Sequence, residues 1–202
     1  DEDGDDTNAV TVTNMNLTAL TAGGNGAGAT ATTAGSVSMT VSSDTTFTGT
    51  YNDGTATVTV AAGATMTDGE TGGTIAFDQQ SIVGAGNVVI TNIGSDLNAD
   101  LSGILNSGTQ TANFATTGTF TGDFGTFDVA VAENVTLTTT AAKVDGLTVT
   151  GNATTEDAGA DTGGSIALTA LGAAAVDLSG VTAGAASEVG DTAGSVTVTT
   201  AD

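Results

Sequence analysis

The feature that most restricts the fold of this chain is an alternation of apolar with small or hydroxylated residues that recurs from one end to the other. A period of two places the apolar residues on one face of a β-strand. Gly, Asn and Asp separate the alternating segments and are typical of turns. The pattern predicts an all-β chain. Examples of the alternation are residues 10–12, 37–39, 58–60, 75–77, 129–131, 135–137, 147–149, 166–168 and 196–198.

No segment has a convincing 3.6-residue period of the kind that an amphipathic helix shows. The nearest approach is the Ala-rich stretch 171–186, whose glycines, valines and threonines disfavour a helix. Acidity combined with low hydrophobicity can indicate disorder. Here, however, 39% of the residues are hydrophobic and the mean hydropathy is +0.18. Thr and Val are β-branched and favour strands, so we expect an ordered β protein.

Two architectures accommodate many short strands. In a parallel β-solenoid (β-helix) the strands coil into stacked turns, called rungs below, and about 22 residues per rung would give roughly nine rungs. The alternative is a β-sandwich of one or two Ig-like domains. We favour the solenoid, because aromatic residues make up only 3% of the chain and Pro is absent. A sandwich core about 10 Å thick usually needs several large aromatic side chains.

Short internal echoes indicate a repeat domain. We expect an acidic N-terminal segment at 1–8 and a single elongated β-repeat domain at 9–202, with approximate repeat units at 46–108 and 118–184. The two ends of the chain also resemble each other in sequence. This similarity is expected if the chain is a piece of a longer repeat array, or if it is a subunit whose repeat pattern continues in a neighbouring subunit. The echoes pair residues 47–51 with 120–124, 100–104 with 177–181, 17–20 with 168–171, and 33–37 with 192–196.

These repeats carry a family resemblance. Residues 84–91, 98–104 and 144–151 resemble the β-strand repeats of bacterial surface proteins, which include giant adhesins and the β-helical S-layer proteins related to RTX exoproteins. The resemblance extends over most of the chain, from about residue 46 to residue 200. It implies secretion, surface display, self-assembly and often calcium. The chain lacks the Gly-Gly-x-Gly-x-Asp array of RTX repeats, so only location and assembly carry over.

The charge of the chain restricts its partners. The formal net charge is −22, and Lys143 is the only cationic side chain. Such a field repels nucleic acid and anionic membrane surfaces, both of which are bound through Lys and Arg. No run of 18 apolar residues predicts a membrane span. The absence of Cys excludes disulfides, and the start at Asp1 leads us to expect a mature form or an excised piece.

The residue types present argue against an enzyme. Nucleophilic catalysis usually needs His, Cys or Lys as nucleophile or base, and this chain has only Lys143. Phosphoryl transfer needs Lys, Arg or a phosphate-binding loop. Paired carboxylates could hydrolyse glycosides. Sites that bind sugars, however, usually also contain aromatic side chains that stack on the sugar rings, and the aromatic residues of this chain are Tyr51 and six Phe. We therefore expect no enzymatic activity.

The candidate metal ligands are Asp1, Asp3, Asp5 and Asp6, which offer carboxylate oxygens at close spacing around Gly4. Calcium prefers six to eight such oxygens, so calcium is the one cofactor that we expect. The alternative is a frayed acidic terminus. Other acidic residues have structural interpretations. Glu156, Asp157 and Asp161 are expected in a solvated loop, and Asp100 and Asp177 are expected to shape turns by accepting backbone hydrogen bonds.

Three Asn residues lie in Asn-x-Thr sequons and are glycosylation candidates: Asn16, Asn134 and Asn152. A Thr-rich chain produces about this many sequons by chance. They matter only if the source glycosylates its surface proteins.

The sequence predicts a self-assembling extracellular structural protein, the subunit of a cell-surface filament or S-layer. In this hypothesis calcium bridges neighbouring subunits. Subunits would join through strand edges or rod ends, with residues 8–20 as the expected donated strand. The alternative is a non-catalytic stalk or binding segment of a giant adhesin, with surface glycans as candidate partners. A third and weaker hypothesis is a β-helical polysaccharide-active protein.

Overall fold

The computed structural model describes residues 10–12, 15–16, 38–48, 51–52, 56–69, 75–94, 97–153, 160–172 and 174–200. Within these ranges the chain is all-β, and its only helical element is the 3₁₀ turn η1 (Ala141–Val144). In the same ranges no helix is long and apolar enough to cross a membrane. The prediction of an all-β chain is confirmed.

The strands are short and follow one another closely along the chain. They are β1 (Val10–Val12), β2 (Met15–Asn16), β3 (Ser38–Val41), β4 (Thr45–Phe47), β5 (Tyr51–Asn52), β6 (Thr57–Val60), β7 (Thr65–Asp68), β8 (Ile82–Gly84), β9 (Asn87–Ile93), β10 (Ile104–Asn106), β11 (Gln110–Phe114), β12 (Gly118–Thr119), β13 (Asp128–Val131), β14 (Thr136–Thr140), β15 (Val149–Gly151), β16 (Ser165–Leu171), β17 (Val181–Thr182) and β18 (Val196–Thr200).

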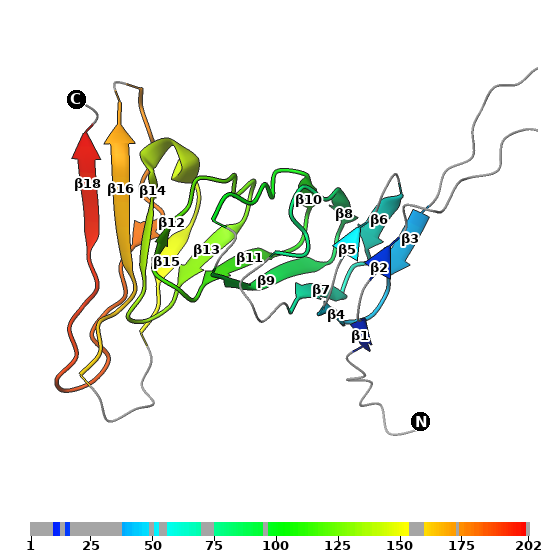
Figure 1. Cartoon of the computed structure of the whole chain (residues 1–202), viewed down its shortest axis with the longest axis horizontal. Helices are drawn as coiled ribbons and strands as arrows, with labels where there is room; N and C mark the ends of the chain where they lie inside the picture. The colour runs from blue at the N-terminus through cyan, green and yellow to red at the C-terminus, as the bar shows by residue number, and fades with distance from the viewer. Residues whose placement is uncertain are drawn as a thin grey trace, which may run out of the picture.

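The strands form four parallel sheets. The long sheet has the order β1-β4-β7-β9-β11-β13-β15-β17, and the chain returns to it once in every rung. A second sheet, β10-β8-β6-β3, is called the N-terminal sheet, and β12-β14-β16-β18 is called the C-terminal sheet. A two-stranded sheet joins β2 to β5. Figure 1 shows the rungs stacked in a row from β1 to β18.

This topology is that of a parallel β-solenoid, so the favoured prediction is confirmed. In the described residues every pairing between strands is parallel, from β1 with β4 to β16 with β18. The sandwich alternative is excluded, because Ig-like sandwiches are built from antiparallel sheets.

The rungs differ in length. Met66 pairs with Val88 and Val88 with Gln110, a spacing of 22 residues each time. Ala112 pairs with Val129, only 17 residues later. The shorter rung arises because the N-terminal sheet stops at β10, so that the chain runs from β12 to β13 without adding a strand to it. The predicted 22-residue rung is therefore found from β7 to β11, and the rungs that follow depart from it.

Apolar side chains form columns inside the coil. Paired positions of the long sheet place Ile90, Ala112, Val129 and Val149 in one column, each at most 2% exposed. Each residue is covered by the rung before it and the rung after it. Burial of a Val or Ile side chain contributes about 1.5–3 kcal/mol, so the interior stabilises a rung only when its neighbours are in place.

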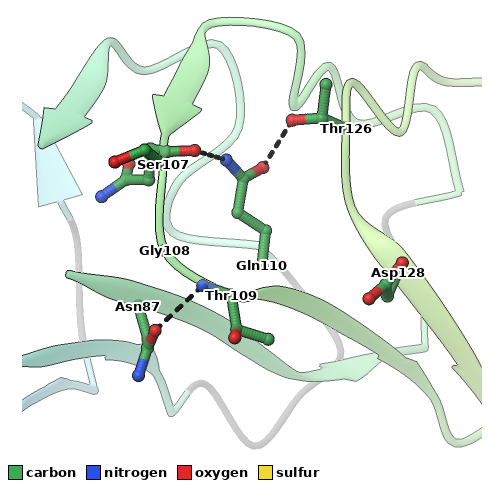
Figure 2. A pocket seen from close by; sticks show the side chains of 8 residues that line it. Asn87, Ser107, Gly108, Thr109, Gln110, Thr126 and Asp128 are labelled. Atoms are coloured by element: carbon green, nitrogen blue, oxygen red, sulfur yellow. Dashed lines mark hydrogen bonds between the residues drawn. The ribbon is translucent and has the colours of Figure 1, made fainter. Parts of the chain in front are cut away.

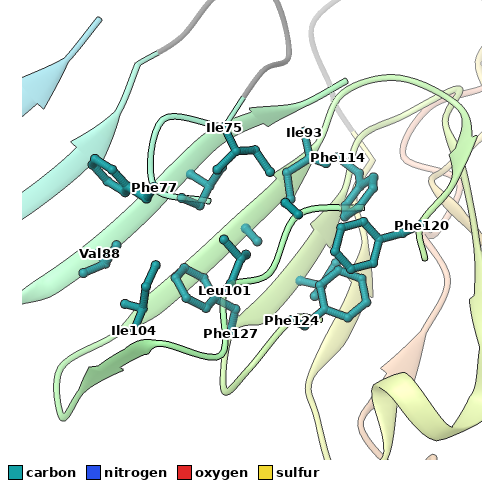
Figure 3. Packing of buried hydrophobic residues seen from close by; sticks show 14 of the residues in the cluster. Ile75, Phe77, Val88, Ile93, Leu101, Ile104, Phe114, Phe120, Phe124 and Phe127 are labelled. Atoms are coloured by element: carbon teal, nitrogen blue, oxygen red, sulfur yellow. The ribbon is translucent and has the colours of Figure 1, made fainter. Parts of the chain in front are cut away.

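All six Phe residues are buried. Most of them gather in two clusters. Phe47, Tyr51 and Phe77 meet edge to face, with ring centroids 5.0–5.8 Å apart. In the second cluster Phe120 stacks on Phe124 with centroids 4.1 Å apart, and Phe114 meets both edge to face. Figure 3 shows the second cluster beside Phe127 and Leu101. The few aromatic residues of the chain are thus buried inside the coil between β4 and β13.

Gly84 is required by close packing between rungs together with its backbone conformation. Gly84 pairs with Val60 in the N-terminal sheet and has a φ of +124°. A Cβ at this position would meet the carbonyl oxygen and the amide nitrogen of Val60. Residues other than Gly rarely adopt a positive φ of this size. Both the backbone conformation and the short distance to Val60 therefore favour Gly at position 84.

Replacement of this glycine tests the stacking. Gly84→Ala is expected to lower the free energy of unfolding by more than about 3 kcal/mol, because the clash adds to the backbone strain. The control is Gly63→Ala, since Gly63 has a φ of +83° but a Cβ added there would have no atom within 4 Å. That change should cost only about 1–2 kcal/mol. Urea denaturation measures both, and equal losses would contradict the close packing.

Candidate functional site

The outermost described rung presents uncovered apolar side chains. Strand β18 pairs with β16, and Val196 and Val198 continue the inner columns of Ile166 and Leu168. Ile166 and Leu168 are each 1% exposed, whereas Val196 is 39% and Val198 is 44% exposed. No described residue pairs with the other side of β18. An open strand with apolar residues is a template for the addition of another strand.

At the other end of the coil, the predicted donor segment pairs within its own chain. Val10–Val12 pairs with Thr45–Phe47, and Met15–Asn16 pairs with Tyr51–Asn52. The rest of residues 8–20 lies outside the described residues. The described parts belong to the first rung of their own solenoid, because they continue the same parallel ladder. The expectation that they are donated to a neighbour is therefore not supported.

A row of charged residues follows one corner of the coil. Each residue directly precedes the same kind of turn, in which an amide bonds the carbonyl oxygen three residues earlier at 3.0–3.1 Å. The turns stack, since Asp100 is bridged to Asp123 and Gly146 N donates to the Asp177 carbonyl oxygen at 2.9 Å. The row therefore places the only lysine of the chain among carboxylates. Its members, in order, are Asp100, Asp123, Lys143 and Asp177.

Carboxylates and amides at the corners also bond neighbouring rungs. Asp78 Oδ1 accepts a hydrogen bond from Asp100 N at 2.7 Å, and Asp145 Oδ1 accepts one from Asp177 N at 2.7 Å. Three further residues act in the same way, each accepting a hydrogen bond from a backbone amide of the next rung at 2.8–2.9 Å. These are Asp44, Asn87 and Asn134.

The predicted turn role of Asp100 and Asp177 agrees with the structure. Ser102 N donates to Asp100 Oδ1 at 3.0 Å, and Ser179 N donates to Asp177 Oδ1 at 2.9 Å. The hydroxyl of Ser102 also donates to Asp100 Oδ1 at 2.6 Å. This hydroxyl, the Ser102 amide and the nearby Lys143 charge lower the pKa of Asp100. The pKa of Asp177 is lowered chiefly by the Ser179 amide.

The lowered pKa of Asp177 predicts a pH dependence. Its bonds to the Ser179 amide and hydroxyl favour the carboxylate, so their stabilisation is present above the unfolded pKa of about 3.9 and is lost as the pH falls through the lower folded value. Below about pH 4, wild type should lose stability relative to Asp177→Asn, which keeps an acceptor oxygen but does not ionise. Chemical denaturation from neutral to acidic pH measures the difference. A difference that stays constant with pH would contradict this role.

The four predicted calcium ligands Asp1, Asp3, Asp5 and Asp6 lie outside the described residues, as do Glu156 and Asp157. In the part of the chain that the structure describes, no group of three or more Asp, Glu, His or Cys side chains could hold a metal ion. Asp161 accepts a hydrogen bond from Asn134 Nδ2 at 2.6 Å. Calcium binding by the N-terminal residues stays a prediction.

The three glycosylation candidates are in different settings. Asn16 lies in β2, Asn152 is exposed after β15, and Asn134 is an exposed turn residue with a φ of 60°. Both polar atoms of the Asn134 side chain are engaged, Nδ2 with Asp161 and Oδ1 with Thr162 N. A glycan on Asn134 would therefore require these two hydrogen bonds to break. Glycosylation stays a prediction at all three positions.

A polar groove lies where the N-terminal sheet ends (Figure 2). Its volume is about 500 Å³. Asn106 and Gln110 are buried, at 9% and 5% exposure, whereas Ser107, Thr109, Thr126 and Asp128 are exposed around them. The full lining is Asn87, Asn106, Ser107, Gly108, Thr109, Gln110, Thr126 and Asp128.

Asn106 and Gln110 were not predicted from the sequence as site residues. Both occupy inward positions, since Asn106 pairs with Gly84 in the column that begins with Val41 and Val60, and Gln110 pairs with Val88. The signal was present in the alternation, because each residue is an amide at a position where the pattern predicts an apolar side chain. Polar side chains at such positions need hydrogen-bond partners, which makes them worth separate attention.

Comparisons with protein-family models, with curated proteins and with solved structures found no match. The function is therefore inferred from the fold and from three features of the molecule: the open β18 edge, the charged row and the polar groove.

Proposed function

We propose that this chain is a self-assembling extracellular structural protein, the subunit of a cell-surface filament or S-layer. The observation that carries the proposal is the uncovered pair Val196 and Val198 on the unpaired side of β18. In this proposal a second copy of the chain covers that rung. Main-chain hydrogen bonds between open strands supply the affinity, as in other cases of strand addition.

The long sheet ends in an outer strand at each end of the described rungs, β1 at one end and β17 at the other. A copy stacked with β1 beside β17 would continue the parallel ladder of this sheet at the usual strand spacing of about 4.8 Å. The other strands of the two end rungs belong to different sheets, since β2 pairs with β5 and β3 lies in the N-terminal sheet, whereas β18 lies in the C-terminal sheet.

Charge repulsion opposes this stacking. Each copy carries a net charge of −22, and like charges at a contact disfavour association unless cations offset them. Monovalent salt screens such repulsion in general. We include calcium as the bridging cation, with Asp1, Asp3, Asp5 and Asp6 as its ligands, because carboxylate oxygens suit it. The proposed activity is non-catalytic.

The alternative function is a stalk or binding segment of a giant adhesin, in which further rungs of the same chain cover β18. The polar groove beside β10 favours this second candidate, because a binding segment requires a ligand site. The two functions differ in whether the purified chain polymerises.

Substitution on the open edge tests the proposal. Val196→Asp combined with Val198→Asp adds charge where a second copy would pack, and it should raise the critical concentration for assembly at least about tenfold, since about 1.4 kcal/mol of contact energy is a factor of ten. The matched control is Val189→Asp, because Val189 is fully exposed outside the strands. Sedimentation and negative-stain electron microscopy, with millimolar calcium and with a chelator, give the readout.

Each result has a defined meaning. Wild type and Val189→Asp should form ordered fibres or sheets in calcium, and the double variant should remain as short rods with an unchanged circular dichroism spectrum. Equal assembly by the double variant would remove β18 as the contact. Separate rods from wild type in all conditions would exclude the assembly function and leave the stalk or binding segment. Assembly that persists in chelator would exclude only the calcium bridge.

A further inference from the structure

The end of the N-terminal sheet leaves a strand edge open within the row of stacked rungs. β10 is the last strand of this sheet, and no described strand pairs with its far side. The chain of the following rung runs through Thr126 directly into β13. Leu105, the central residue of β10, is 64% exposed. An open strand with an exposed apolar side chain is a site where a strand of another molecule can pair.

The hydrogen bonds of β10 indicate which of its main-chain groups face the open side. Ser107 N donates to the Gly84 carbonyl oxygen of β8 at 2.8 Å. Because alternate residues of a parallel strand bond to opposite neighbours, the amides and carbonyls of Ile104 and Asn106 point away from β8. These four groups are the ones that an added strand would bond.

Two of these four groups already have partners within the chain. Ile104 N donates to the Leu101 carbonyl oxygen at 3.0 Å in the preceding turn. The Asn106 carbonyl oxygen accepts a hydrogen bond from Gln110 Nε2 at 2.7 Å. The side-chain amide of Gln110 therefore takes the place of the backbone amide that an incoming strand would offer at the end of β10.

The Gln110 side chain is fixed in this orientation. It is 5% exposed, and its Oε1 accepts a hydrogen bond from the Thr126 hydroxyl at 2.9 Å. This second bond determines which end of the amide faces β10, because only the NH₂ end can donate. Figure 2 shows the amide between Ser107, which follows β10, and Thr126 of the next rung. Displacement of Gln110 would leave buried polar groups without partners, which is unfavourable.

The inward column to which Gln110 belongs does not explain an amide. Met66 and Val88 precede Gln110 in this column, and both are apolar and fully buried. A polar side chain at such a position costs free energy unless hydrogen bonds compensate for it. Both hydrogen bonds of the Gln110 side chain go to groups beside the open edge, so the edge accounts for the residue.

We propose that Gln110 closes the β10 edge against a strand from a second copy of the chain. Proteins with open strand edges use side chains in comparable ways to prevent association. The closure confines pairing between copies to the ends of the coil. This role concerns a different edge from β18 and does not depend on whether copies assemble there.

Removal of the amide tests this role. The test uses the background of Val196→Asp with Val198→Asp, so that pairing through β18 does not contribute. There Gln110→Val removes both hydrogen bonds and places an apolar residue in the column, and it should lower the concentration at which dimers form at least about tenfold. The control is Gln80→Val, since Gln80 Nε2 donates to the Asp78 carbonyl oxygen at 2.8 Å in the turn before β8. That variant should associate no more than the background does, as measured by sedimentation velocity.

Amide resonances of the ¹⁵N-labelled variant locate the contact. Residues 104–107 of Gln110→Val should shift with protein concentration while the circular dichroism spectrum stays unchanged. Thr126→Val removes the hydroxyl that orients the amide and should change association in the same direction, so it decides the test if Gln110→Val does not fold. Association equal to that of the background, or shifts confined to other residues, would overturn the proposal. A purely structural role would lower stability to urea without any gain in association.

Discussion

The whole structure depends on one kind of interaction, the parallel backbone ladder between neighbouring rungs. Among the described strands none pairs within its own rung, so each strand relies on the rung before it or the rung after it. In repeat architectures of this kind the stability is approximately a sum of contributions from neighbouring units. The columns of Ile90, Ala112, Val129 and Val149 follow from that ladder, because in-register strands place inward residues directly above one another.

The same dependence explains why corner side chains matter. Asp78 and Asp145 accept backbone hydrogen bonds from the following rung, so they fix the register at turns, where the ladder itself is interrupted. The same dependence also explains why the end of a sheet affects the surface of the molecule. Where the ladder stops, as at β10 and β18, the molecule leaves either a step that side chains must bridge or an edge that another rung could cover.

Much of the fold could be predicted from the sequence. The period-two alternation indicated the all-β class, and the scarcity of aromatic residues favoured the solenoid over the sandwich. The turn roles of Asp100 and Asp177 were also correctly predicted, since an Asp two residues before a Ser is a local signal. The pairing of Ala112 with Val129 after 17 residues was not predictable, because register between rungs is set by contacts between distant segments rather than by local pattern. The groove was missed for that reason, since its two walls meet through Gln110 and Thr126, which are 16 residues apart in the sequence.

Lys143 provides a single position on the coil for chemical labelling of a lysine side chain. Its ε-amino group is the only side-chain amine in a chain of 202 residues, and it stands at one defined corner, directly before the turn that leads from Val144 to Leu147. An acyl group on the Lys143 side chain would therefore mark each copy on one face and at one height. In any regular array of copies, such marks would reveal the axial repeat and the direction in which successive copies point.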